Sequence, residues 1–154
     1  MIVMPEVPIT GKKTEKSRGV LPAEVSLKDA VYNLNRTALL VAALAQGRVD
    51  LLSVATQDRL HQPYRASLVP GLRSVFQAAL DAGAKGVALS GAGPSVIAFV
   101  EENAEPVSVA MEGAFQWAGS DARSIIVGLA RDGARVLSGP GNEPEPPARA
   151  PYWG

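Results

Sequence analysis

Two apolar runs separated by a four-residue turn constrain the fold of this chain more than any other feature. Residues 87–90 (VALS) and 95–100 (SVIAFV) have the length and composition of strands, and GAGP lies between them. A link this short returns the chain on itself, so the two runs are predicted to form an antiparallel hairpin. Helical patterns precede and follow this hairpin.

The longest helical pattern starts at Ser26. Ser26 is the predicted N-cap, Asp29 completes a capping box, and Gly47 ends the helix. Its apolar residues recur at helical spacing: Leu27, Ala30, Val31, Leu34, Ala38, Val41 and Ala45.

Three further helices are predicted. Asp50 caps a shorter one over 51–60, which runs on until Pro63 interrupts it. The others cover 70–83 and about 106–118, each opened by a proline. Their inward stripes are Leu72, Val75, Phe76, Ala79 and Leu80, and Val107, Ala110, Met111, Ala114 and Phe115.

Strands are predicted at 1–4, at 124–130 and, after an Asp-Gly turn, at 134–137. The basic segment 10–22 has no apolar period and is predicted to be a loop. The order is then βαββαβ, with extra helices in the first crossover. This order predicts an α+β, ferredoxin-like fold, an antiparallel sheet with helices on one face.

The predicted domain covers residues 1–137. Residues 138–154 hold five of the twelve prolines and are predicted to be a disordered tail. The chain starts with strand-like residues at Ile2, which suggests a piece of a longer protein.

Composition excludes several functional classes. Fifteen basic residues balance fifteen acidic ones, so no overall field attracts nucleic acid or an anionic membrane. The chain has no cysteine and a single histidine, His61, which argues against disulfides and against a metal site. No apolar run approaches the roughly 18 residues of a membrane span, and a cytoplasmic location is expected.

The glycine turn is not a known phosphate-binding loop. A P-loop requires a lysine and a following helix, and a dinucleotide fingerprint requires the same helix. The segment GAGPS has no lysine and is followed by a strand. Backbone N–H groups at Gly91 and Gly93 can still approach an anion or another loop, and a plain tight turn is an equal alternative.

The segment DRLHQPYR is the second candidate site. It brings Asp58, Arg59, His61 and Arg65 within about two helical turns. The planar fork of an arginine suits a carboxylate or a phosphate. For His61 a half-buried packing role is the favoured alternative. No acid–base pair, activated nucleophile or other catalytic group stands out.

Four segments together resemble a known family. They are KSRGVLP (16–22), 26–44, DRLHQPYR (58–65) and LSGAGPSVIAF (89–99). In this order and spacing, they resemble the C-terminal half of the homoserine kinases, a branch of the GHMP small-molecule kinases. The resemblance covers about residues 2–137.

The resemblance implies transfer of the γ-phosphoryl group of Mg-ATP to the hydroxyl of L-homoserine, in threonine biosynthesis. It implies that Arg18 and Arg65 bind the substrate carboxylate, which suits a guanidinium. His61 completes the candidate substrate-binding set. The motif that would lie against a phosphate loop on another domain consists of Ser90, Gly91, Ala92, Gly93, Pro94 and Ser95.

The sequence also departs from the family. It reads TEKSR before Gly19, where the family often shows an STKEAR-like run. Nothing in it resembles the family's ATP loop, its Mg²⁺-binding acid or the aspartate near the substrate hydroxyl. The expectation is a truncated kinase, inactive alone, that meets ATP only through an absent N-terminal domain and exposes an apolar patch there.

Other readings stay open. The main alternative is a non-catalytic ferredoxin-like module that binds an amino acid or a protein. Another GHMP kinase, such as a mevalonate-pathway enzyme, is disfavoured by KSRGVLP and HQPYR. A homodimer is possible on this sequence.

Overall fold

The computed structural model describes residues 1–6 and 13–130 of the chain. The strands are β1 (Ile2–Pro5), β2 (Gly86–Leu89), β3 (Val96–Phe99) and β4 (Ala122–Ile125). The helices are α1 (Lys13–Gly19), α2 (Leu27–Ala45), α3 (Leu52–Ala55), α4 (Gln62–Arg65), α5 (Leu72–Asp81) and α6 (Glu105–Trp117), with 3₁₀ turns η1 (Val49–Leu51) and η2 (Ala66–Leu68).

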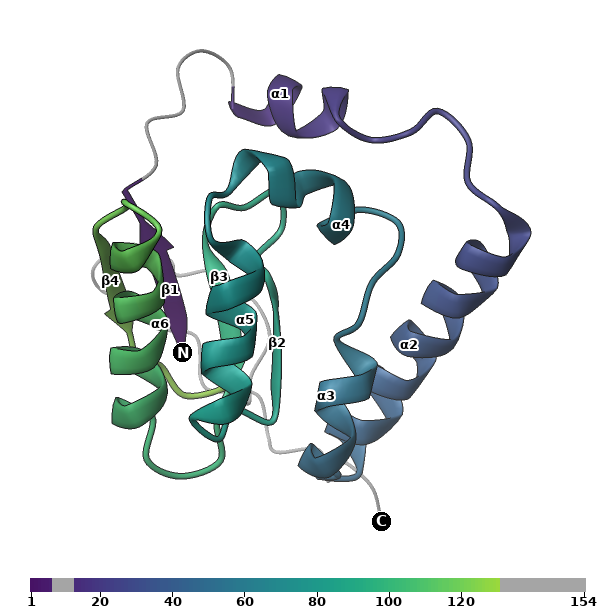
Figure 1. The fold of residues 1–154 in the computed structure, drawn as a ribbon. Helices are drawn as coiled ribbons and strands as arrows, with labels where there is room; N and C mark the ends of the chain where they lie inside the picture. Colours follow the sequence, from purple (N-terminus) through teal and green to yellow (C-terminus); the bar gives the residue numbers. More distant parts are fainter. Residues whose placement is uncertain (7–12, 131–154) are drawn as a thin grey trace, which may run out of the picture.

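The four strands form one antiparallel sheet in the order β2-β3-β1-β4. Val96 of β3 lies opposite both Leu89 of β2 and Val3 of β1, so the hairpin joins the sheet through β3. Helices α5 and α6 lie side by side on one face (Figure 1). The predicted βαββαβ order and α+β class are confirmed.

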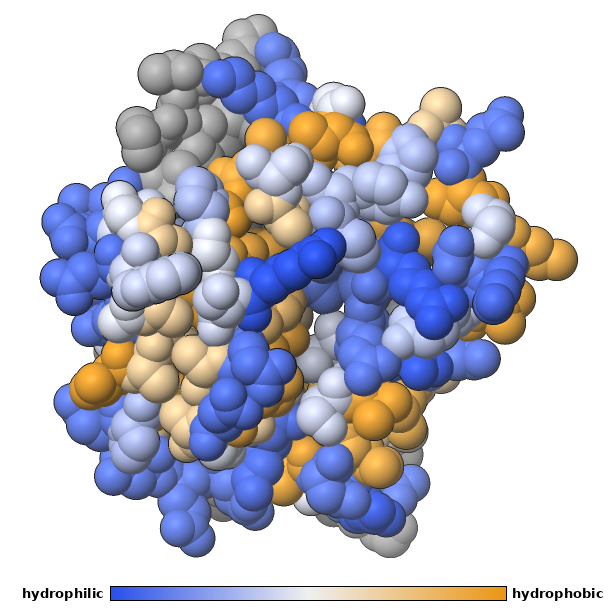
Figure 2. Space-filling model, viewed as in Figure 1, coloured by the Kyte–Doolittle hydropathy of each residue, from blue (hydrophilic) through white to orange (hydrophobic). Residues whose placement is uncertain are grey.

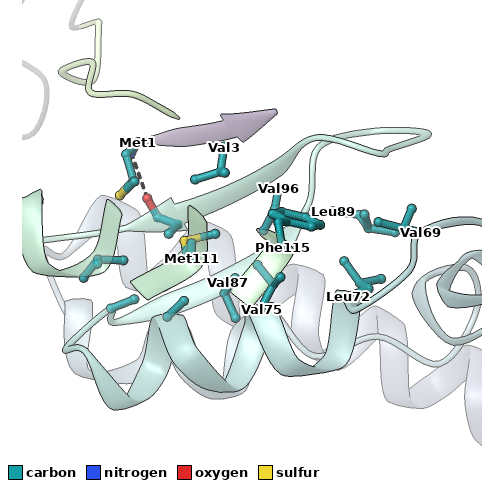
Figure 3. Close-up of a cluster of buried hydrophobic side chains, with 14 of the residues drawn as sticks. Met1, Val3, Val69, Leu72, Val75, Val87, Leu89, Val96, Met111 and Phe115 are labelled. Carbon is teal, nitrogen blue, oxygen red and sulfur yellow. Dashed lines mark hydrogen bonds between the residues drawn. The ribbon is translucent and has the colours of Figure 1, made fainter. Parts of the chain in front are cut away.

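The core lies between the sheet and these two helices (Figure 3). Side chains alternate along each strand, so Val96 and Ala98 are fully buried while Ile97 and Phe99 are only half-buried on the other face. The amino group of Met1 donates a hydrogen bond of 2.8 Å to the carbonyl of Ala98. The largest fully buried side chains are Phe115, Leu52, Met111, Val3, Val75, Val96 and Val107.

Helix α2 starts as the sequence predicts, but its apolar stripe is exposed. The Ser26 hydroxyl accepts the Asp29 N–H at 3.1 Å and donates to the Asp29 carboxylate at 2.7 Å. Among the described residues, Leu27 is 81% exposed, Leu34 68% and Val41 65%. Figure 2 shows hydrophobic side chains along the outer edge where α2 lies.

Two predictions in the first crossover are wrong. Residues 13–19 form α1 instead of a loop, and Arg65 of α4 donates a hydrogen bond to the carbonyl of buried Ser17, one of the last carbonyls of that helix. The helix predicted from 51 ends at Ala55, and Pro63 stands in the first turn of α4 instead of interrupting a helix.

Asp50 does not cap a helix through its side chain. Both of its carboxylate oxygens accept hydrogen bonds from the Arg48 guanidinium, at 2.8 and 2.7 Å, within η1 and its N-cap.

The strand predicted at 124–130 lies earlier in the chain. Strand β4 pairs with β1 from Ala122 opposite Pro5 to Ile125 opposite Ile2, so the register with β1 ends there. The predicted strand at 134–137, the Asp-Gly turn before it and the tail 138–154 lie outside the described residues. No helix in the described part of the chain is long and apolar enough to cross a membrane.

Candidate functional site

The glycine turn joins β2 to β3 through backbone hydrogen bonds. The Ser90 N–H donates to the Ser95 carbonyl at 2.8 Å, and the Gly93 N–H donates to the Ser90 carbonyl at 3.1 Å. Gly91 and Gly93 have φ angles of +59° and +79°, a region that side chains with a Cβ rarely adopt. The Gly93–Pro94 peptide is cis. The two glycines are therefore needed for this turn to close.

Arg65 connects the glycine turn to α1. From the end of α4, its Nε donates to the Ser17 carbonyl at 3.2 Å and its Nη1 donates to the Gly91 carbonyl at 3.1 Å. Nη1 also lies 3.3 Å from Nδ1 of His61. A guanidinium has five N–H groups. The two on Nη2 have no acceptor among the described residues and are available to a ligand.

The surroundings of His61 favour its neutral form with the proton on Nε2. Arg65 can only donate, so Nδ1 of His61 must accept its hydrogen bond. Nε2 faces a carboxylate oxygen of Asp58 at 3.5 Å. Burial lowers the pKa of His61, Asp58 opposes this shift, and the positive charge of Arg65 adds to it. A neutral His61 thus supports Arg65 without a second positive charge beside it.

Asp58 organises the segment that carries these groups. Its side chain is only 6% exposed. One carboxylate oxygen accepts the N–H groups of Leu60, His61 and Gln62, at 3.1, 2.7 and 2.7 Å. The other accepts the side-chain amide of Asn33 on α2. Gln62 is the first residue of α4 and His61 is its N-cap, so Asp58 holds the backbone where that helix begins.

Gln62 fixes the strand that leads into the glycine turn. It is 7% exposed, its Oε1 accepts the Leu89 N–H at 2.8 Å, and its Nε2 donates to the Thr56 carbonyl at 3.1 Å. The sequence interpretation did not single out Gln62. Its position beside Pro63 in HQPYR gives no sign that it bonds a strand 27 residues away.

These segments enclose a cavity of about 400 Å³. The residues that line it are Ser17, Arg18, His61, Arg65, Leu89, Gly91 and Ala92. Arg18 is exposed and its side chain makes no hydrogen bond with another described residue. No described Asp or Glu lines the cavity, so its two guanidinium groups favour an anion.

The structure therefore places the three predicted substrate-binding residues around one cavity. Of the predicted glycine motif, Gly91 and Ala92 line it, while Ser90, Gly93, Pro94 and Ser95 form the rest of the turn. Arg59, the other basic residue of DRLHQPYR, points elsewhere and lines a different cavity. No three His, Cys, Asp or Glu side chains gather to hold a metal ion within residues 1–6 and 13–130.

The comparison with protein families decides the assignment. The family model described as GHMP kinases C terminal matches residues 40–116, half of the chain. The chain belongs to the GHMP kinase C-terminal family. The match spans α3 to α5, the hairpin and most of α6, and includes Arg65 and the glycine turn.

Two relatives of this GHMP kinase domain are homoserine kinases. The chain is 76% identical to a homoserine kinase of Symbiobacterium thermophilum over 154 residues, which is 100% of this chain and 48% of that protein. It is 53% identical to a homoserine kinase of Desulfitobacterium hafniense over 125 residues, 80% of this chain and 42% of that protein. The chain spans about half the length of the curated relatives it matches.

A solved structure agrees with the GHMP kinase fold. The crystal structure of homoserine kinase from Cytophaga hutchinsonii matches with a TM-score of 0.71 and 34% sequence identity. The match covers 79% of this chain and 38% of that one.

Proposed function

We propose that this chain forms the homoserine-binding side of an ATP-dependent homoserine kinase. The observation that carries the proposal is the joint position of Arg18 and Arg65 on a cavity beside the glycine turn. L-Homoserine has a carboxylate, and a guanidinium binds a carboxylate through paired, charge-assisted hydrogen bonds. The free Nη2 group of Arg65 and the exposed Arg18 are the donors for this carboxylate.

The reaction would form a bond between the homoserine hydroxyl oxygen and the γ-phosphorus of ATP. The bond from that phosphorus to the bridging oxygen breaks, ADP leaves, and the hydroxyl proton is released. Such transfers depend on positioning and on neutralising the phosphates. The contribution of this chain is to position homoserine through its carboxylate. Mg²⁺, when bound, supplies charge neutralisation, and we assign no described residue to it.

ATP binding then falls to residues outside this sequence, and the glycine turn is the surface that meets them. The turn presents backbone and almost no side chains, so another loop can approach closely at Gly91. The exposed stripe of α2 supports the idea that this chain acts with further protein, since apolar patches commonly mark interfaces. The chain alone is expected to have no kinase activity. Threonine biosynthesis, a cytoplasmic location and a homodimer remain predictions.

Calorimetry with L-homoserine tests the proposal directly. The 154-residue chain should bind L-homoserine, and 3-aminopropan-1-ol, which lacks the carboxylate, should not bind. Replacing Arg65 with Gln should weaken binding by about tenfold or more, the scale of a charged hydrogen bond. Arg123→Gln, an exposed position on β4, is the matched control.

Two further outcomes separate the parts of this proposal. An affinity for L-homoserine that Arg65→Gln leaves unchanged would refute the assigned site. Adding the separately expressed N-terminal half of the Symbiobacterium thermophilum relative, with Mg-ATP, should produce homoserine-dependent ATP turnover. Homoserine or protein binding without turnover in that mixture would favour the non-catalytic module instead.

A further inference from the structure

A second cavity, of about 380 Å³, lies between α5 and the α2–α3 pair. Figure 2 shows a hollow there with hydrophilic side chains at its rim. The volume falls in the range of small-molecule sites, roughly 300–1,000 Å³. Arg18, Arg65 and the glycine turn do not line it, so it is separate from the cavity described above.

One wall of this cavity is apolar. Leu72, Phe76 and Leu80 project from one side of α5, and Val87 of β2 closes the floor. Leu72 and Val87 are buried, Phe76 is partly buried, and Leu80 is 36% exposed. The exposure of the wall therefore increases from the protein core outward. Its outer part is free to contact an apolar group.

The rim is cationic. Arg59 and Arg73 line the cavity together with Tyr32. The Tyr32 ring also packs against two guanidinium groups, with the Cζ atoms of Arg36 and Arg59 at 3.7 and 3.8 Å from its centroid. Two groups this close to one centroid must lie on opposite faces of the ring. A buried Nε of Arg36 has no hydrogen-bond partner among the described residues.

Two acids lie near these cations. Asp58 lines the cavity, and its carboxylate is held in place by the three N–H groups at the start of α4 and by the Asn33 amide. Asp29 reaches only Arg59, at 3.4 Å. Arg73 makes no ion pair or hydrogen bond with another described residue. Arg73 is therefore a guanidinium without an acid partner among the described residues, and it lies at the rim above an apolar wall.

We propose that this cavity binds a small organic anion, a carboxylate that carries an apolar tail. The carboxylate pairs with the guanidinium groups of Arg59 and Arg73, and the tail packs on Phe76 and Leu80. A bare phosphate would leave the apolar wall uncovered, and a neutral apolar molecule would leave Arg73 unpaired. The proposal does not depend on the kinase activity proposed above.

The test uses the full chain and the probe 4-phenylbutyrate, measured by calorimetry and by ¹⁵N NMR. The probe should bind about tenfold more tightly than 4-phenylbutan-1-ol, which lacks the charge, or than inorganic phosphate, which lacks the tail. Amide shifts should centre on Ser53, Phe76 and Val87 and spare Arg18 and Gly91. Equal affinity for the alcohol, shifts centred on the glycine turn, or no binding at millimolar concentration would overturn the proposal.

Two variants that leave the core intact give the matched comparison. Arg73 is exposed and Leu80 lies at the rim, so Arg73→Gln and Leu80→Gln should fold normally. Each variant should lower the affinity for the probe by about fivefold or more. Arg65→Gln should weaken the binding of L-homoserine and leave the affinity for the probe unchanged. Arg73→Gln should weaken the binding of the probe and leave the affinity for L-homoserine unchanged. Wild-type probe affinity in Arg73→Gln would refute this site and leave the homoserine site untouched.

Discussion

Replacing Asp58 with Ala removes a side chain that holds the start of α4. The Asp58 carboxylate accepts the N–H groups of Leu60, His61 and Gln62 and the side-chain amide of Asn33. Its side chain is 6% exposed, so water does not readily replace these bonds. An unpaired buried donor costs about 1–3 kcal/mol, and such losses add incompletely. We expect Asp58→Ala to lower the free energy of unfolding by about 3–5 kcal/mol.

Asp58→Asn separates the capping role from the contact with α2. An asparagine keeps one oxygen for the three N–H groups, but its amide nitrogen then faces the donating amide of Asn33. Asn33 cannot turn its amide without cost, because its own oxygen accepts the Arg59 N–H at 2.9 Å. The expected loss is about 1–3 kcal/mol, the cost of one donor left unpaired.

Urea denaturation followed by circular dichroism measures these changes. Asp121→Ala is the control, since that exposed aspartate makes no side-chain hydrogen bond or ion pair with another described residue and should change stability by less than about 0.5 kcal/mol. If the free energy of unfolding of Asp58→Ala lay within about 1 kcal/mol of that of the control, the capping argument would be refuted. Homoserine affinity should fall with Asp58→Ala, because Arg65 stands at the end of the helix that Asp58 starts.

The remaining predictions concern pH and glycine packing. Burial holds the pKa of His61 below its usual 6.5, so the unfolded chain binds the proton more readily than the folded chain. The free energy of unfolding should therefore fall as the pH drops through about 6.5. In denaturation experiments at about pH 7.5 and about pH 5.5, His61→Asn should show a smaller fall than the wild type. An equal fall in both proteins would contradict the assigned neutral state. A Cβ at Gly86 would lie 2.8 Å from the Leu52 carbonyl oxygen, so Gly86→Ala should destabilise by about 1–3 kcal/mol. A Cβ at Gly113 in α6 would have no neighbour within 4 Å, so Gly113→Ala should stabilise the protein by about 0.5–1 kcal/mol. If Gly86→Ala and Gly113→Ala changed the free energy of unfolding in the same direction, this packing argument would be contradicted.

The sheet and its two covering helices were predictable because local signals agreed. The hairpin has apolar runs of strand length on both sides of a turn that requires positive φ at Gly91 and Gly93. The stripes predicted for α5 and α6 supply buried core residues such as Val75 and Phe115. Period and turn chemistry therefore pointed to the same fold.

The helices of the first crossover were less predictable because distant residues stabilise them. Helix α1 has no apolar period, and one of its contacts with the rest of the domain is the hydrogen bond from Arg65 to Ser17, 48 residues apart. Helix α4 is one turn long, with His61 as its N-cap, and its first N–H, at Gln62, donates to Asp58 four residues earlier in an irregular segment. Pro63 in the first turn is a common feature of helix starts, and the interpretation of Pro63 as an interruption concealed it.

The candidate site also has a part that the sequence predicted and a part that it did not. Resemblance in the motifs led to Arg18, Arg65 and the glycine turn, and the structure brings them to one cavity, where their roles remain to be tested. The support beneath them was not visible in the motifs. Gln62 ties the strand before the turn to α4, and Asp58 ties α4 to α2.

Asp58 and Gln62, which support the segment that carries Arg65, line the second cavity, although no residue lines both cavities. The hydrogen bonds of these two residues hold Leu89 and the start of α4. A ligand that displaced Gln62 would have to release the Leu89 N–H, a buried donor, at about 1–3 kcal/mol. Binding in the second cavity is therefore expected to leave the glycine turn in place, and this is why the two sites can be tested independently.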